Sequence, residues 1–186
     1  MKKAVIWLVF AVLLGGCSGS SNQMERAMEL RGKILAAESC CFDTEITADY
    51  GDKIYIFSMD CQADAQGNLA FTVTAPETIS GITGILSDSG GKLTFDDTAL
   101  AFELMADDQL SPVSAPWIFM KTLRSGYITS AGMDEDSLLV GIEDSYDEDA
   151  LHLDIWLDDS NLPLRAEILY DGRRILSLTV TNFQIR

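Results

Sequence analysis

The chain has 186 residues, 47% of them hydrophobic, and a formal net charge of −16. This length suits one ordinary domain with a substantial core, and the strong negative charge repels nucleic acid, so a nucleic-acid-binding role is excluded. With a single histidine and no pair of C-x-x-C motifs, the sequence predicts no metal site and no cofactor.

Residues 1–16 have the layout of a bacterial lipoprotein signal peptide. Lys2 and Lys3 form a positive segment, and residues 4–14 are an uninterrupted apolar run, shorter than the about 20 residues of a membrane-spanning helix. The following Leu14-Gly15-Gly16-Cys17 resembles the lipobox, at which a signal peptidase cuts before a lipid-modified cysteine. We therefore predict lipidation of Cys17. The protein would then be exported and anchored to the outer face of the cytoplasmic membrane, or to an outer membrane if the cell has one.

A tether and a helix are expected after the lipobox. Residues 17–21 hold the lipidated cysteine and a short Gly/Ser stretch, a composition typical of a flexible link. Apolar residues then recur at helical spacing, which predicts a helix over residues 22–37 with Asn22 as its N-cap. We expect residues 22–186 to form a single domain.

Beyond the first helix the hydrophobic pattern changes to the alternation that is typical of strands. Gly51-Asp52 predicts a tight hairpin turn, and a short helix opened by Pro116 is expected over residues 116–124. The predicted strands cover residues 42–50, 54–61, 68–75, 82–86, 92–95, 100–105, 127–130, 138–142, 151–157, 164–170 and 175–183. The expected fold is α+β: a large antiparallel sheet curled into an open half-barrel, covered by the N-terminal helix and the short mid-chain helix.

Three cysteines remain once Cys17 is assigned to lipid, so at most one disulfide can form within the chain. A strict two-residue turn at Gly51-Asp52 places Cys61 opposite Phe42. A one-residue bulge would instead place Cys61 opposite Cys41, and bulges are common near turns. We predict a Cys41–Cys61 disulfide with Cys40 free; the alternative is three reduced thiols packed as small apolar residues.

The polar motifs do not indicate catalysis. His152 alternates with leucines on a strand and has no G-x-S-x-G partner motif, so a solvated strand histidine is expected. The acidic run over residues 143–149 could offer oxygen ligands to calcium, but it lacks the spacing of an EF-hand loop. We interpret it as a solvated turn, and we predict that the protein is not an enzyme.

The order of elements, together with two turn motifs, resembles the LolA/LolB lipoprotein-carrier superfamily. The motifs are Pro76-Glu77-Thr78-Ile79-Ser80-Gly81 and Asn161-Leu162-Pro163-Leu164. The chain looks closest to a lipid-anchored branch that includes germination lipoproteins of Gram-positive spore formers. The resemblance implies a half-barrel whose concave apolar face either binds acyl chains or is plugged by the protein's own helices.

Residues on apolar strand faces are candidates for the wall of such a cavity, although the same residues would serve as ordinary core. They are Phe57, Phe71, Leu153, Ile155 and Ile168, with Trp117 in the mid-chain helix as a lid or plug. The leading hypothesis is a membrane-anchored envelope lipoprotein that binds an acyl chain or lipid. The alternative is a non-enzymatic scaffold that docks and stabilises an envelope or spore-cortex hydrolase, so the expected partners are the membrane and either a lipid cargo or an envelope protein.

Overall fold

A computed structural model describes residues 19–186 except 96–97, 103–104, 107–108 and 148. The predicted signal peptide and Cys17 lie outside the described residues. Two α-helices are described, α2 (Gly19–Ala36) and α3 (Ala115–Ser125), and a 3-10 turn (Pro112–Ser114) leads into α3. None of the described helices is long and apolar enough to span a membrane.

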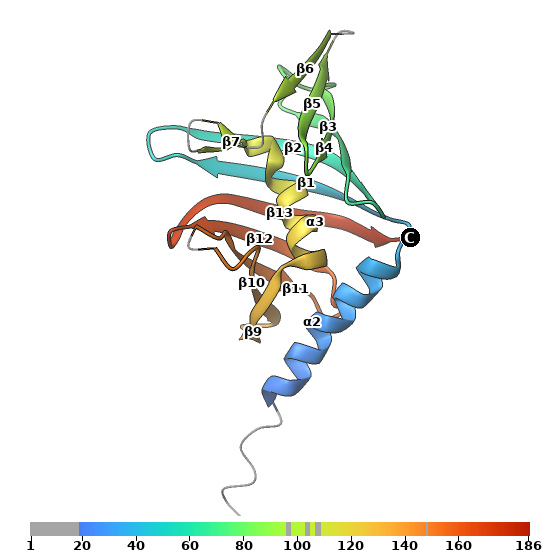
Figure 1. The fold of residues 1–186 in the computed structure, drawn as a ribbon, viewed down its shortest axis with the longest axis vertical. Coiled ribbons are helices and arrows are strands. Elements are labelled where there is room, and N and C mark those ends of the chain that lie inside the picture. Colours follow the sequence, from blue (N-terminus) through green and yellow to red (C-terminus); the bar gives the residue numbers. More distant parts are fainter. Residues whose placement is uncertain (1–18, 96–97, 103–104, 107–108, 148) are drawn as a thin grey trace, which may run out of the picture.

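Eleven antiparallel strands form one open sheet, which confirms the fold class expected from the sequence (Figure 1). The strands are β1 (Ser39–Asp49), β2 (Ile54–Asp64), β3 (Leu69–Ala75), β4 (Thr83–Ser87), β5 (Gly90–Phe95), β6 (Thr98–Phe102), β9 (Tyr127–Asp134), β10 (Ser137–Glu143), β11 (His152–Leu157), β12 (Pro163–Tyr170) and β13 (Arg173–Ile185). A separate two-stranded ribbon, β7 (Met105–Ala106) and β8 (Gln109–Leu110), precedes the 3-10 turn.

The sheet is open because its two edge strands do not pair with each other. The strand order is β6-β5-β4-β3-β2-β1-β13-β12-β11-β10-β9, so the C-terminal strand β13 lies between β1 and β12. Helix α3 lies across the inside of the curved sheet, and α2 runs along the side of β9 (Figure 1). The predicted half-barrel therefore has both of its expected helices.

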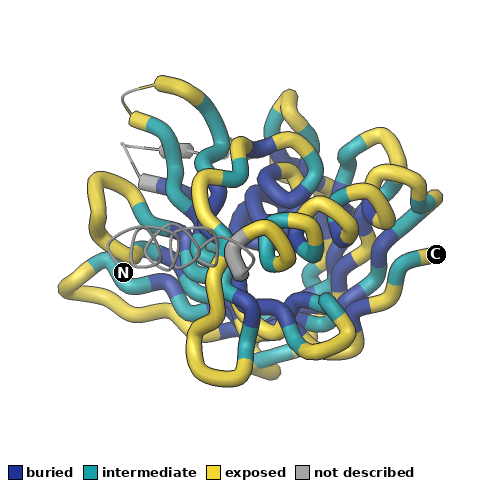
Figure 2. Tube along the Cα trace, turned by 90° about the horizontal axis from the view of Figure 1, so that it is seen from below, coloured by how far each residue is buried: buried dark blue, intermediate teal, exposed yellow. Residues whose placement is uncertain are grey.

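Alternation along the strands gives the sheet an apolar concave face. In β1, Cys40, Phe42, Thr44 and Ile46 are buried, and the residues that alternate with them are more exposed. Figure 2 shows buried residues gathered on the inner side of the sheet and on the helix inside it. The ring of Phe42 contacts Phe183 of β13 and Phe119 of α3, at centroid distances of 5.5 and 5.8 Å. This contact joins the first strand, the last strand and the enclosed helix.

Two phenylalanine rings on the concave face cover glycines of neighbouring strands. A Cβ atom at Gly84 of β4 would lie 2.4 Å from Cζ of Phe71, and one at Gly91 of β5 would lie 2.3 Å from Cζ of Phe102. Such aromatic cover over a strand glycine compensates for the missing side chain. A side chain at either glycine would therefore displace the ring that covers it.

Helix α2 begins earlier than the sequence predicted. It starts at Gly19, inside the expected tether, rather than at Asn22. Polar residues are tolerated there because the first N–H groups of a helix have no intrahelical partner. Ala27, Leu30 and Ile34 form its buried stripe, whereas Met28 is 52% exposed.

Candidate functional site

The candidate site is the concave face of the half-barrel, which the protein's own helix α3 occupies. All but a few of the α3 residues are buried, and these include Trp117, Ile118, Phe119, Met120 and Leu123. A helix that is apolar on most of its sides is stable only inside a core. The position of this helix agrees with the sequence prediction. Of the two alternatives for the concave face, a bound acyl chain or a plug formed by the protein's own helices, the structure shows the plug.

Hydrogen bonds from side chains to backbone carbonyls hold both ends of α3. Nε of Arg31, on α2, donates to the carbonyl oxygen of Leu123 at 2.7 Å. Nη2 of Arg124 donates to the carbonyl oxygen of Ala65 at 2.7 Å, and Nε1 of Trp117 donates to that of Gly67 at 3.0 Å. The contacts of Arg124 and Trp117 reach the β2–β3 turn, so α3 is joined to α2 on one side and to the sheet on the other.

Arg31 is the less obvious of these contacts. Partial burial lowers the pKa of its guanidinium, but an arginine stays charged at any physiological pH. The charged donor therefore faces the carboxyl end of α3, where the helix dipole is negative. Arg31 was not among the site residues predicted from the sequence, although its place next to the apolar Leu30 on an amphipathic helix was a signal.

The space left on the concave face is small. A gap of about 10 Å³ lies between α2, α3 and the strands β9–β11, lined by residues that include Leu30, Leu123 and Ile155. A second pocket of about 230 Å³ lies along the face of α3 that carries Trp117 and Arg124, next to the β2–β3 turn. Ligand pockets commonly measure about 300–1,000 Å³. An acyl chain can therefore enter the region around Ile155 only if a helix moves.

The six predicted cavity-lining residues are all buried in one continuous core: Phe57, Phe71, Trp117, Leu153, Ile155 and Ile168. Leu153, Ile155 and Ile168 are fully covered, at 0% exposure. Ile155 borders the small gap and Trp117 borders the larger pocket. In this structure the interior side chains are core residues packed around α3, and their role as a cavity wall stays a prediction.

The register of the first hairpin contradicts the predicted Cys41–Cys61 disulfide. The backbone N–H of Tyr50 donates to the carbonyl oxygen of Lys53 at 3.0 Å, so the turn is the strict two-residue one. Phe42 then lies opposite Cys61, and the three cysteines are free. Because neighbouring side chains point to opposite faces of a strand, Cys61 points inward and Cys41 outward. The bulge near Cys41 does exist, but it lies on the β13 side of β1.

The single histidine of the chain lies between two carboxylates. His152 Nδ1 lies 2.9 Å from Glu143 Oε1, and its Nε2 lies 3.1 Å from Asp154 Oδ1. Burial lowers the pKa of His152, but the two carboxylates outweigh that effect and raise it. Both ring nitrogens are therefore engaged, and the contact with Glu143 links β11 to β10. Across the described ranges, no group of three or more potential ligand side chains is placed to hold a metal ion.

Comparison with known proteins gives structural matches only. No protein-family model matches the sequence, and no curated protein matches it. A LolA superfamily protein from Nitrosomonas europaea superposes with a TM-score of 0.46 and 10% identity over 86% of this chain and 93% of its own. Lipoprotein LppX of Mycobacterium tuberculosis gives 0.41 and 12% over 87% and 93%, and LprF of Mycobacterium bovis gives 0.43 and 11% over 89% and 94%. These similarities assign neither a ligand nor a partner to this chain.

Proposed function

We propose that this protein is a membrane-tethered envelope lipoprotein that binds an acyl chain or lipid on the concave face of its half-barrel. The observation that carries the proposal is the chemistry of the plug. Helix α3 presents apolar side chains to an apolar wall, with only a few hydrogen bonds at its ends. If an acyl chain replaced α3, apolar surface of the helix would be exposed to water and apolar surface of the chain would be buried. The two changes would nearly cancel, since burial of either surface is favourable by about 25 cal/mol per Å².

The anchor is the second part of the proposal. A signal peptide over residues 1–16 would be removed, Cys17 would carry lipid, and residues 22–186 would form the exported domain. Helix α2 begins at Gly19, so the lipid would be joined almost directly to a helix that contacts α3. The protein would not be an enzyme and would not bind nucleic acid.

Uptake of a fluorescent fatty acid tests the binding proposal. We expect weak binding by the wild type and stronger binding by Arg31→Met, because that variant removes the hydrogen bond to Leu123 and favours departure of α3. Lys33→Met is the matched control, since Lys33 lies on the exposed side of the same helix and pairs with Glu29. Absence of uptake in all three proteins, and absence of lipid in native mass spectra, would contradict the proposal.

The packed interior favours a second candidate function. With only about 10 Å³ free between α2, α3 and the strands, the domain could act without cargo, as a rigid scaffold for an envelope or spore-cortex hydrolase. A scaffold would show no lipid in native mass spectra, and Arg31→Met would leave fatty-acid uptake undetectable. The two functions are therefore separated by the experiment described above.

Replacement of Cys17 tests the anchor by itself. Cys17→Ala should give a protein that is no longer labelled by a fatty-acid probe and that leaves the detergent phase on partitioning. Ser18→Ala, which retains the thiol, is the matched control. Unchanged labelling of Cys17→Ala would refute the lipoprotein assignment.

A further inference from the structure

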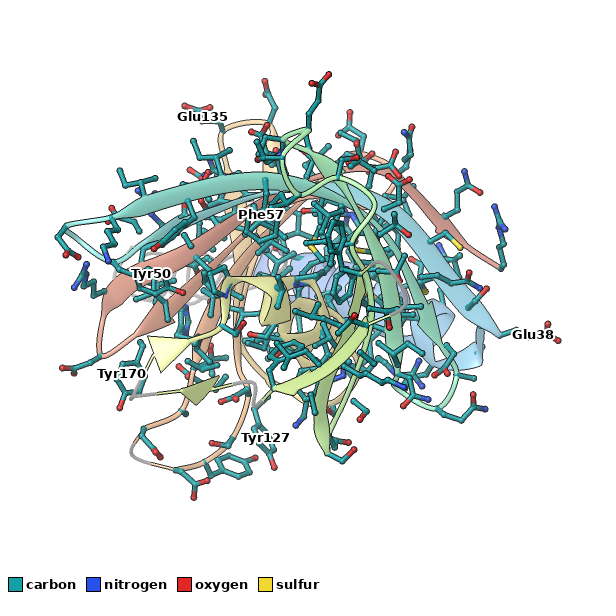
Figure 3. All side chains as sticks on the ribbon, turned by 90° about the horizontal axis from the view of Figure 1, so that it is seen from above. Glu38, Tyr50, Phe57, Tyr127, Glu135 and Tyr170 are labelled. Atoms are coloured by element: carbon teal, nitrogen blue, oxygen red, sulfur yellow. The ribbon has the colours of Figure 1, made fainter. Side chains whose placement is uncertain are left out.

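A second hollow lies outside the concave core, at the end of the sheet where three turns meet. It has a volume of about 620 Å³ and lies between the turns β1–β2, β10–β11 and β12–β13. Its apolar floor consists of Tyr50, Leu110, Leu151, Tyr170 and Ile175. Figure 3 shows Tyr50 and Tyr170 together at this end of the molecule, far from Glu38 at the other end. We call this hollow the mouth cleft.

Hydrogen bonds fix the positions of residues in the floor of the mouth cleft. The hydroxyl of Tyr50 donates a hydrogen bond to the carbonyl oxygen of Leu110, which ties the end of β1 to the segment before α3. The backbone N–H of Leu151 donates to Oδ1 of Asp144 at 2.8 Å, and the N–H of Asp144 donates to the carbonyl oxygen of Leu151 at 3.0 Å. Three of the five floor residues, Tyr50, Leu110 and Leu151, therefore take part in hydrogen bonds that fix their positions.

Carboxylates from all three turns surround this floor. They are Asp49, Asp144, Asp147, Asp149 and Asp171, and Arg173 is the one basic residue among those that line the cleft. In the described part of the chain none of the five carboxylates forms an ion pair; the ion pairs that do form involve Glu29, Asp88, Glu143, Asp154 and Glu167. Five carboxylates against one guanidinium leave the rim of the cleft with an excess of negative charge.

The combination of floor and rim defines the chemistry of the occupant. Burial of an apolar side chain against the floor is favourable. The acidic rim attracts positive charge and repels anionic lipid headgroups. The charges stand on three separate turns around the floor, so an occupant needs several cations placed around an apolar anchor. We propose that the mouth cleft binds a basic polypeptide segment in which Lys or Arg residues flank a large apolar side chain. Such complementarity fixes partner choice and speeds association.

Peptide binding by the full chain, held in phosphatidylcholine nanodiscs, tests the proposal by fluorescence anisotropy. The probe is a short labelled peptide of alternating Lys and Leu, compared with a Glu/Leu peptide and a Lys/Ser peptide. We expect binding of the Lys/Leu peptide only, weakened as salt rises from about 0.05 to about 0.5 M because charge interactions are screened. Empty nanodiscs provide the background.

Two variants locate the binding. Asp147→Asn/Asp171→Asn removes two rim charges, and asparagine tolerates the positive φ of 49° at position 171. We expect the Lys/Leu peptide to bind about 2- to 30-fold more weakly, as two exposed charge pairs predict. Asp136→Asn/Asp159→Asn removes the same charge from exposed turns at the other end of the strands and should leave binding unchanged. Tyr170→Ser, at a ring that is 41% exposed, should weaken the Lys/Leu peptide and so test the floor.

Four results would overturn the proposal. Equal binding of the Glu/Leu peptide would remove the role of the rim, and equal binding of the Lys/Ser peptide would remove the role of the floor. Equal weakening by the two double variants would reduce the effect to net charge. Self-association in sedimentation that disappears in Asp147→Asn/Asp171→Asn would assign the cleft to a second copy of the chain.

Discussion

Replacing Arg31 by methionine should release α3 selectively from the concave face. Methionine keeps the apolar stem of the arginine side chain but cannot donate to the carbonyl oxygen of Leu123, which Nε of Arg31 contacts at 2.7 Å. Nη2 of Arg31 also lies 3.4 Å from the carbonyl oxygen of Thr122, but the N–H of Gly126 bonds that oxygen as well, at 2.9 Å. The change therefore leaves chiefly the Leu123 carbonyl without its partner.

The size of the effect follows from that single charged donor. A hydrogen bond to a charged group contributes about 1.5–3 kcal/mol, and each 1.4 kcal/mol is a factor of about ten in population. The open state, with α3 away from the sheet, should thus become roughly 10- to 100-fold more populated. Packing of Trp117, Ile118 and Phe119 is untouched, so the closed state remains dominant.

Native-state hydrogen exchange measures this population directly. We expect the amides of α3 to exchange about 10- to 100-fold faster in Arg31→Met, with the amides of β1 and β13 unchanged. Lys33→Met should change neither set, because Lys33 lies on the exposed side of α2, where it pairs with Glu29. Unchanged exchange in α3, or equal acceleration in the sheet and the helix, would refute the idea that Arg31 acts on α3 alone.

Three further predictions concern the cysteines, the histidine and a strand glycine. Under native conditions an alkylating reagent should modify Cys41 first, because Cys40 and Cys61 are buried and burial raises the pKa of their thiols. A disulfide-linked Cys41 in a non-reducing peptide map would contradict the hairpin register. His152→Gln should lower the free energy of unfolding most below pH 6.5, the ordinary pKa of histidine. The difference from the wild type should vanish as the pH rises through the raised pKa of the folded state. Equal differences in urea titrations at acid and alkaline pH would refute this. Gly84→Ala should destabilise by about 1–3 kcal/mol, since its Cβ would lie 2.4 Å from Phe71 and 2.8 Å from a backbone oxygen, whereas Gly132→Ala, with nothing within 4 Å, should be nearly neutral in the same denaturation assay.

Local sequence signals predicted the element order well, because each depends on neighbours in the chain. Alternation of apolar residues identified the strands, and Gly51-Asp52 identified a turn whose two-residue geometry is observed. Pro116 marked the start of the short helix, within one residue of its observed first position. The signals were weaker at helix ends, because polar residues suit either a tether or a first helical turn. The start of α2 was therefore predicted at Asn22, whereas the helix begins at Gly19.

Contacts between distant segments were decided by the tertiary structure alone. The sequence could not tell whether the concave face held a ligand or a helix, because the same apolar residues serve as cavity wall and as core; only the packing of Phe119 against Phe42 and Phe183 shows the helix inside. Likewise, the mouth cleft unites Asp49, Asp144 and Asp171, which stand on turns far apart in the chain, and the strand order brings those turns to one end. The sequence by itself determined which residues are apolar, which are acidic and where the chain turns. Their grouping into a plugged core and an acidic cleft depends on sheet register and curvature, which are properties of the whole fold.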